Sequence, residues 1–489
     1  MIVGVDVGTS VTKASLLKRD GSALVTHSVR STLRRSPGGR VEQDLGEVLD
    51  SVVQVVREVS AEADKSGEQV EALAITGQGD GLWLRDEQGH QVGPAISWLD
   101  ARSSDVLDRW HDTGVLRQVY ALTGSGMFPG SAGPLLAYLA EHDPERLERA
   151  AVAGYCVDAI VQRFTGEITV DASDASLPFL DVPTRTYSVE ALRACGLEEH
   201  RRLLAEPAPP NKLFALEAKS AKELGLPAGL PVSAGPFDLP ACAFGAGVEG
   251  PGDGTLVIGT TLGCQVLRDT VDIDADGEIA GMWLATPRPD RYLRVMPAMV
   301  GTANLDWVLR TVGARIEELE TLLGNSRPGA GGVSALSFLA SSGERAPFVE
   351  PHARGQFTGL SLETTPADLV RAMCEAVAYA ARHNLEAAGL TGEVSACGGG
   401  ARSAAWSQIF ADVLGTSLHV PYEEGVGARG AAMTAWDSLG EPVDREKWAA
   451  ARRVVRPHPN AVEFYERGYR DYLASIDRAR PLWQQGAES

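Results

Sequence analysis

The chain has 489 residues, of which 44% are hydrophobic and 22% are charged, so its size and composition are typical of a globular protein with more than one domain. Its formal net charge is -20 at pH 7, which argues against nucleic acids and anionic membranes as partners, because surfaces for them need clustered lysines and arginines. The partner that we expect is a small molecule.

The cysteines and the amino terminus indicate a cytoplasmic protein. The six cysteines lie singly, with no Cys-x-x-Cys pair, which favours free thiols in a reducing compartment. The first ten residues, MIVGVDVGTS, carry Asp6 inside their apolar run and lack a basic start, which argues against a signal peptide. Residues 231–248 contain three prolines and Asp238, which excludes a transmembrane helix there.

Strands joined by short turns begin the chain. Residues 2–28 predict a strand, a Gly-Thr-Ser turn, a second strand, an Asp-Gly turn and a third strand. Beyond them we expect an amphipathic helix over residues 45–60, strands over 72–76 and 95–98, and a helix from residue 103. Hairpins followed by alternating strands and helices predict α/β domains with mixed sheets.

The strand at 72–76 runs directly into Gly77-Gln78-Gly79-Asp80-Gly81. This sequence sets one carboxylate between two glycines at the end of a buried strand. Asp-Gly is a strong hairpin signal, and glycine adopts positive φ at little cost. The local pattern alone therefore favours an ordinary turn.

Asp238 stands before an apolar helix of small residues, in AGPFDLPACAFGAG. One interpretation is a helix N-cap, a position that Asp favours strongly. The other is a base at the positive end of that helix, ready to accept a proton from a hydroxyl group. The sequence around Asp238 leaves both interpretations open.

A segment about half the chain further on resembles the amino terminus. Residues 255–267, TLVIGTTLGCQVL, predict a strand, a Gly-Thr-Thr turn and a second strand, and DADGEIAGMW supplies a further turn and strand. The repeat suggests two similar domains. Such turns present N–H groups and hydroxyls that suit phosphate oxygens, and a neighbouring carboxylate such as Asp6 can hold magnesium through water. Two ordinary hairpins, with Asp6 capping locally, are the alternative.

Three further glycine-rich segments follow different patterns. Residues 396–406, ACGGGARSAAW, join a strand to a helix, where a flat ligand can lie against the backbone, although a plain loop would also use Gly400. Gly-x-Gly-x-x-Gly matches occur at 245–250 and 425–430. Neither opens a strand-turn-helix unit at a domain start, and the chain has no Gly-Lys pair, so a Rossmann oxidoreductase and a Walker A loop are both disfavoured.

The order of these motifs resembles the FGGY carbohydrate kinases. The motifs are Asp6-x-Gly8-Thr9-Ser10, Gln78-Gly79-Asp80-Gly81, Trp98-Leu99-Asp100-Ala101-Arg102, Asp238 after Ala234-Gly235, Gly259-Thr260-Thr261, Gly343-Glu344-Arg345-Ala346-Pro347, Gly398-Gly399-Gly400-Ala401-Arg402 and Gly427-Ala428-Arg429-Gly430-Ala431-Ala432. Residues 355–375 are similar to that family's carboxy-terminal signature, with Cys374 where an aliphatic or aromatic residue is usual. The resemblance covers nearly the whole chain.

The resemblance implies an α/β protein with two actin-like, ribonuclease-H-like ATPase domains and an interdomain cleft. Residues 1–245 would bind a sugar or polyol, and residues 246–489 would bind the nucleotide. The implied activity is an ATP-dependent carbohydrate or polyol kinase with Mg2+ as its metal and Asp238 as its general base. A homodimer is a further expectation.

The resemblance also implies particular site residues. The substrate-binding set is Gln78, Gly79, Asp80, Trp98, Asp100, Phe237 and Asp238. The nucleotide-binding and phosphate-binding set is Gly8, Thr9, Ser10, Lys13, Gly259, Thr260, Thr261, Gly399, Gly400, Ala401, Arg402 and Ser403. Magnesium would be held by Asp6 and, through water, by Asp238.

Within the family, the combination of ITGQGDGLWL, WLDAR and an apolar residue after the base is most similar to erythritol kinases. Glycerol kinases have Arg-Glu, and xylulose kinases Met-His, where Gly79-Asp80 stands here. Leu239 replaces a common Asn or Gln, Leu135 a common Lys and Tyr138 a common Trp. We therefore expect a polyol such as erythritol, with a ketopentose such as xylulose as the alternative. The different-class alternative is an inactive, actin-like protein that binds nucleotide or sugar.

Overall fold

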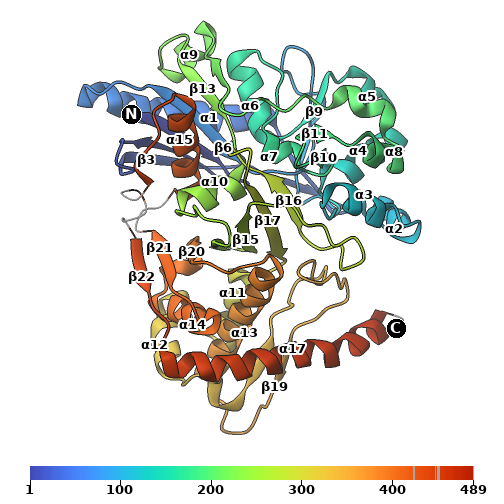
Figure 1. The fold of residues 1–489 in the computed structure, drawn as a ribbon, viewed down its shortest axis with the longest axis vertical. Coiled ribbons are helices and arrows are strands. Elements are labelled where there is room, and N and C mark those ends of the chain that lie inside the picture. Colours follow the sequence, from blue (N-terminus) through green and yellow to red (C-terminus); the bar gives the residue numbers. More distant parts are fainter. Residues whose placement is uncertain (422–424, 446–447, 449–451, 488–489) are drawn as a thin grey trace. The chain divides into compact units, whose positions relative to one another are not determined.

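The computed structural model describes residues 1–421, 425–445, 448 and 452–487. The chain forms two compact units (Figure 1). The first consists of Met1–Gly247, Asp269–Leu293 and Glu423–Ala451, and the second of Val248–Arg268, Arg294–Tyr422 and Arg452–Ser489. Both units are α/β, as the sequence predicts. The first unit also contains two segments from the second half of the chain, whereas all segments of the second unit lie in that half.

The first unit is built on a mixed sheet with the strand order β12-β13-β6-β1-β2-β3. The strands are β1 (Ile2–Val7), β2 (Val11–Leu17), β3 (Ala23–Arg30), β6 (Ala72–Gly77), β12 (Leu213–Ala215) and β13 (Pro231–Ala234). The three amino-terminal strands run antiparallel, whereas β1, β6 and β13 run parallel to one another. Parallel strands end at the same edge, so the loops after β1, β6 and β13 are brought together there.

Helix α1 (Leu45–Ser66) shows how the sequence sets these boundaries. Its valines at 52, 55, 56 and 59 are fully buried, as the spacing of one helix face requires. Asp44 caps the start by accepting a hydrogen bond from the Glu47 N–H, and Gly67 ends the helix with a φ of 70°. The helix therefore extends about two turns beyond the predicted residue 60.

The remaining helices of the first unit are α2 (Ser104–Asp112), α3 (Val115–Thr123), α4 (Ala132–His142), α5 (Pro144–Arg149), α6 (Cys156–Thr165), α7 (Ala172–Ala175), α8 (Val189–Ala194), η1 (Glu198–Leu203), α9 (Ala218–Leu224), α10 (Asp238–Gly245) and α15 (Val426–Ser438). Its short strands are β4 (Arg34–Ser36), β5 (Arg40–Gln43), β7 (Trp83–Arg85), β8 (Ala95–Ile96), β9 (Val152–Gly154), β10 (Leu180–Asp181), β11 (Thr186–Tyr187) and β16 (Met282–Ala285). In Figure 1, α15 in red lies beside α10 in green, and the two helices are in contact although they are distant in the sequence.

The second unit repeats the sheet of the first. Its strands follow the order β17-β15-β14-β20-β21-β22. They are β14 (Gly254–Ile258), β15 (Leu262–Arg268), β17 (Tyr292–Ala298), β20 (Val394–Cys397), β21 (Leu418–Pro421) and β22 (Arg452–Val455). Strands β14, β20 and β21 are parallel, in the way that β1, β6 and β13 are. The duplication predicted from the two Gly-Thr turns is therefore present. The further strand predicted from DADGEIAGMW is present as β16, which begins at Met282 near the end of that segment.

The second unit also contains α11 (Thr302–Val312), η2 (Ile316–Glu318), α12 (Leu319–Gly324), η3 (Ala330–Gly332), α13 (Pro366–Ala387), η4 (Gly399–Arg402), α14 (Ala404–Leu414) and α17 (Pro459–Ala487), with the hairpin strands β18 (Ser334–Leu336) and β19 (Gln356–Thr358). None of the helices among the described residues has the length and hydropathy that a transmembrane span needs.

Candidate active site

Asp238 is the first residue of α10, directly after the turn that follows β13. Phe237 occupies the N-cap position, so the interpretation of Asp238 as the N-cap is wrong. The carboxyl group instead lies in the first helical turn, where the helix dipole favours negative charge. Burial raises the pKa of Asp238 to about 8, and the charges of Asp6 and Asp80 act in the same direction. These two carboxylates are therefore near neighbours of Asp238.

Asp6 lies at the end of β1, opposite Lys13 in β2. Burial raises the pKa of Asp6 to about 6, while the charge of Lys13 opposes this shift. Gly427 of α15 packs against the same carboxylate, and a Cβ atom at position 427 would stand 2.6 Å from Asp6 Oδ2. The absence of a side chain at 427 therefore makes room for Asp6.

Glycines also bring helices α10 and α15 close together. A Cβ atom on Gly430 would overlap the Ala241 backbone carbonyl, and one on Gly245 would overlap the Val426 carbonyl. These residues belong to the two Gly-x-Gly-x-x-Gly matches. Their role in the structure is backbone-to-backbone packing, which holds Asp6 and Asp238 in one region of the first unit.

A chain of hydrogen bonds joins the first turn to the loop after β6. Trp98 Nε1 donates to Thr9 Oγ1 at 2.9 Å, and Thr9 Oγ1 donates to Gln78 Oε1 at 3.0 Å. Gln78 Nε2 in turn donates to Gln43 Oε1 at 2.9 Å. The Thr9 hydroxyl, which the resemblance assigned to phosphate, thus connects two of the predicted substrate residues. Of its neighbours in the turn, Gly8 closes it with an N–H bond to the Val11 carbonyl at 3.1 Å, and Ser10 is exposed.

The Gln78-Gly79-Asp80-Gly81 segment turns sharply but does not form a hairpin. Asp80 and Gly81 have φ values of 56° and 75°, whereas the strands on either side, β6 and β7, pair with other strands. A Cβ atom on Gly79 would stand 2.5 Å from Phe237 Cδ2. The Phe237 ring therefore fills the space that a side chain at 79 would need, and Asp80 is the acidic side chain that the loop presents.

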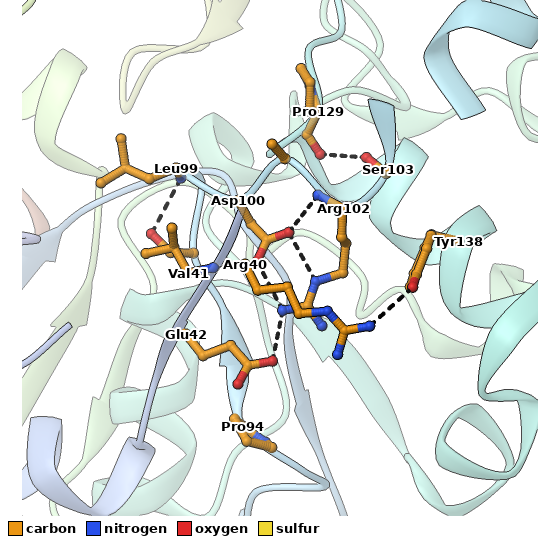
Figure 2. A network of polar contacts seen from close by, with 12 residues as sticks. Arg40, Val41, Glu42, Pro94, Leu99, Asp100, Arg102, Ser103, Pro129 and Tyr138 are labelled. Atoms are coloured by element: carbon orange, nitrogen blue, oxygen red, sulfur yellow. Dashed lines mark hydrogen bonds and ion pairs between the residues drawn. The ribbon is translucent and has the colours of Figure 1, made fainter. Parts of the chain in front are cut away.

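Asp100 is held in a polar network instead of being available to a ligand. Figure 2 shows its carboxylate facing the Arg102 guanidinium and the Val41 amide. Arg102 Nε and Nη2 donate to its two oxygens at 2.9 and 2.8 Å, and the Val41 N–H donates at 2.6 Å. Arg102 also contacts Glu42 Oε1 at 2.6 Å. With an exposed fraction of 2%, Asp100 positions the backbone that follows Trp98.

In the second unit, the Gly259-Thr260-Thr261 turn is braced by the start of α11. The Gly301 N–H donates to the Thr260 carbonyl and the Thr302 N–H to the Gly259 carbonyl, each at 2.7 Å. A Cβ atom on Gly301 would stand 2.5 Å from the Gly259 oxygen, so only glycine permits this approach. The result is a rigid turn whose form the neighbouring loop fixes.

The glycine-rich segment after β20 forms the short helix η4. Gly400 packs tightly against Ile258, whereas a Cβ atom on Gly399 would meet no atom within 4 Å. Ala401 is buried, Arg402 is exposed, and Ser403 caps α14 through the Trp406 N–H at 3.0 Å. Trp406 is fully buried, so its indole is part of the core and cannot lie against a flat ligand.

The structure thus brings Asp6, Asp80, Phe237 and Asp238 together in the first unit, and the two glycine turns together in the second. In the part of the chain that the structure describes, no three metal-binding side chains form a cage. Mg2+ commonly uses only one or two carboxylates together with substrate phosphates and water. Asp6 and Asp238 fit this pattern, because their mutual repulsion is what a divalent cation would relieve.

Two further residues were missed by the sequence predictions. Gly427 belongs to the Gly427–Ala432 motif, but the motif does not predict its contact with Asp6, and Asp174, in VDASDAS, has no predicted role. Asp174 is fully buried, and its carboxyl has no hydrogen-bond partner among the described residues. The only signal for it in the sequence is the spacing of Asp171 and Asp174.

Comparisons with known proteins agree on one family. Family models for the N-terminal and C-terminal domains of the FGGY family of carbohydrate kinases match residues 1–245 and 255–437. The erythritol kinase of Brucella abortus is 33% identical, over 99% of this chain and 97% of that protein. The xylulose kinase of Escherichia coli is 30% identical, over 89% of each chain. The structure of a ligand-bound xylulose kinase from Lactobacillus acidophilus matches with a TM-score of 0.90 at 21% identity, over 99% of both chains.

Proposed function

Because the chain belongs to the FGGY family of carbohydrate kinases, we propose that it transfers the γ-phosphate of ATP to a hydroxyl of a small polyol such as erythritol. The observation that carries this proposal is the half-buried Asp238 carboxyl, set at a helix start beside Asp6 and Asp80. A protein that only binds nucleotide or sugar has no need of such a base. Xylulose is the second candidate, supported by the 30% identity to the Escherichia coli xylulose kinase.

Asp238 acts as the general base. The acceptor hydroxyl donates a hydrogen bond to its carboxylate, and the proton moves to that carboxylate as the hydroxyl oxygen attacks the γ-phosphorus. The bond from phosphorus to the leaving ADP oxygen breaks in the same step. A base whose pKa is about 8 has more affinity for this proton than an ordinary aspartate, yet remains partly ionised near neutral pH.

Asp6 and Asp238 would hold Mg2+, in part through water. When bound, the metal neutralises charge on the transferred phosphoryl group. Lys13, opposite Asp6, adds a fixed positive charge to this region. In the second unit, the Gly259-Thr260-Thr261 turn binds phosphate oxygens and the Gly399–Ser403 segment borders the adenosine.

The acceptor lies against the loop after β6. Asp80 accepts hydrogen bonds from its hydroxyls, and Trp98 offers an apolar face whose orientation the Thr9 bond fixes. Gln78 and Asp100 are positioning residues, because their polar atoms bond to other parts of the protein. Phe237 leaves no room for a side chain at position 79. The acceptor site therefore differs in shape from the site of a kinase that has a larger residue at this position.

A panel of uncharged acceptors tests the proposed function. ATP-dependent phosphorylation of polyols and ketoses with three to seven carbons is measured by ADP release. We expect the highest kcat/KM for a four-carbon polyol. The highest value for xylulose would assign the second candidate, and ATP binding without turnover of any acceptor would overturn the kinase proposal.

Two glycine substitutions on α15 separate catalysis from packing. Gly427→Ala would set a methyl group 2.6 Å from Asp6 Oδ2, so the Asp6 carboxylate must move. We expect kcat to fall about tenfold or more, in the range of a lost transition-state contact, with little change in Tm. Gly430→Ala overlaps the Ala241 backbone, so it must separate two helices and should lower Tm by several degrees. Equal kcat in Gly427→Ala and the parent protein would contradict the role given to Asp6.

A further inference from the structure

Asp174 is an exception among the buried acids that the structure describes. Its exposed fraction is 0%, and neither carboxyl oxygen has a hydrogen-bond partner in the described residues. Buried polar groups are nearly always paired, because an unpaired one costs about 1–3 kcal/mol. A group kept in this condition therefore calls for a functional explanation.

The other buried aspartates show what a structural role looks like. Asp158 forms an ion pair with Arg85 at 2.8 Å and accepts from the Tyr155 N–H at 2.6 Å. Asp100 is bound by Arg102, and Asp412 accepts from Gln408 and His458. Each of these carboxylates has partners within the fold, whereas Asp174 has none among the described residues.

Asp174 lies in α7, which is joined to the segment that carries Asp238. The Phe237 N–H donates to Ser173 Oγ at 3.2 Å. Gly235 packs against Asp171, where a Cβ atom would stand 2.7 Å from the Asp171 side chain. Both contacts place the residues beside Asp174 against the turn that leads to the catalytic base.

On its other side, Asp174 is close to the loop after β6. The charge of Asp174 raises the pKa of the Cys156 thiol, after the larger effect of burial, and Cys156 Sγ lies 3.9 Å from Gln78 Nε2. Burial raises the pKa of Asp174 itself well above its ordinary value, and the charges of Asp158, Asp171, Asp238 and Asp80 add to this. This shift favours the uncharged form of the carboxyl, which lies in the region shared by Asp80 and Asp238.

We propose that Asp174 is a specificity-determining residue of the acceptor site, where its carboxyl group forms hydrogen bonds with an uncharged polyol or ketose. This inference rests on the proposed function. An ionised carboxylate can only accept hydrogen bonds, whereas a protonated carboxyl group offers both a donor and an acceptor. Together the two residues recognise neighbouring hydroxyls of one carbon chain. A site built in this way loses affinity when either partner is removed.

Asp174→Ala and Asp174→Asn test the inference. For the best acceptor of the panel, we expect Asp174→Ala to raise KM by about 10- to 100-fold, as for the loss of one or two buried hydrogen bonds. Both kcat and the KM for ATP should stay within about threefold, because Asp238 and the nucleotide site are intact. Asp174→Asn retains a donor and an acceptor, so its acceptor KM should change by less than about fivefold.

Stability provides the second measurement. An unpaired buried carboxyl does not stabilise the fold, so neither variant should lower Tm. Asp412→Asn is the matched control, a buried aspartate with partners in the second unit, and it should lower Tm while leaving the acceptor KM unchanged. A lower Tm with an unchanged acceptor KM in Asp174→Ala would overturn the proposal, since it would indicate an internal water as the partner of Asp174.

Acceptor binding without ATP, measured by isothermal titration calorimetry, separates the two hypotheses. If the parent protein binds the acceptor in this titration but does not phosphorylate it when ATP is added, the proposed kinase function is wrong. Equal acceptor Kd for the parent protein and Asp174→Ala overturns the role of Asp174 alone. A weaker Kd in Asp174→Ala, restored in Asp174→Asn, supports it.

Discussion

Asp238→Asn is expected to lower kcat by about 10³-fold, the usual contribution of a positioned general base. The amide has nearly the shape of the carboxyl group but cannot take the proton from the acceptor. The KM for ATP should change by less than about twofold, because binding of the nucleotide is assigned to residues of the second unit. Steady-state kinetics with the best acceptor give kcat, and calorimetric titration gives the ATP Kd.

Asp276→Asn is a matched control, because it makes the same chemical change at an exposed site of the first unit. This variant should be indistinguishable from the parent protein. If the kcat of Asp238→Asn lies within tenfold of the kcat of this control, Asp238 is not the general base.

The pKa of Asp238 adds a pH dependence to this result. Only the ionised group accepts a proton, so kcat/KM of the parent protein should rise about tenfold per pH unit below pH 8 and level off above it. Because the folded pKa of about 8 lies above the ordinary value of 3.8, the folded state binds the proton more tightly than the unfolded state. Stability contributed by this group therefore falls as pH rises from about 4 to 8. The Tm of Asp238→Asn should exceed that of the parent protein increasingly from pH 5 to pH 8.

Features that depend on neighbouring residues could be predicted from the sequence. A Gly-Thr-Ser turn between two apolar strands determines its own geometry, and the same pattern at Gly259 predicted the second copy of the sheet. The predicted helix at 45–60 is of this kind too, since one face of valines specifies both its period and its buried side. The predicted end of the helix, at residue 60, is too early. The helix continues to Ser66 because Gly67 terminates it, whereas the prediction relied on the hydrophobic pattern.

Contacts between distant segments could not be predicted in this way. Gly427 makes room for Asp6, and Ser173 bonds the backbone next to Asp238, across long separations in the sequence. No local pattern encodes such pairs. The same limit explains Asp100, which looked like a substrate ligand until the fold placed Arg102 and the Val41 amide against both of its oxygens.

Asp80 has the largest expected effect on acceptor recognition, and its backbone decides which substitution tests it. With a φ of 56°, the residue lies in the left-handed region, which Asp and Asn tolerate far better than Ala. Asp80→Asn therefore removes the charge without straining the loop. We expect the acceptor KM to rise about 10- to 100-fold, because hydrogen bonds to a charged group contribute about 1.5–3 kcal/mol.

The control for Asp80→Asn makes the reverse exchange at a similar backbone position. Asn211, in an exposed turn, has a φ of 61°, so Asn211→Asp reports the cost of exchanging these two side chains there. Its kinetics should match those of the parent protein. The KM for ATP should stay within about twofold in Asp80→Asn, because Asp80 contacts the acceptor alone. An equal rise in both KM values would place Asp80 outside the acceptor site, and the choice between polyol and ketose would then depend on Trp98 and Asp174.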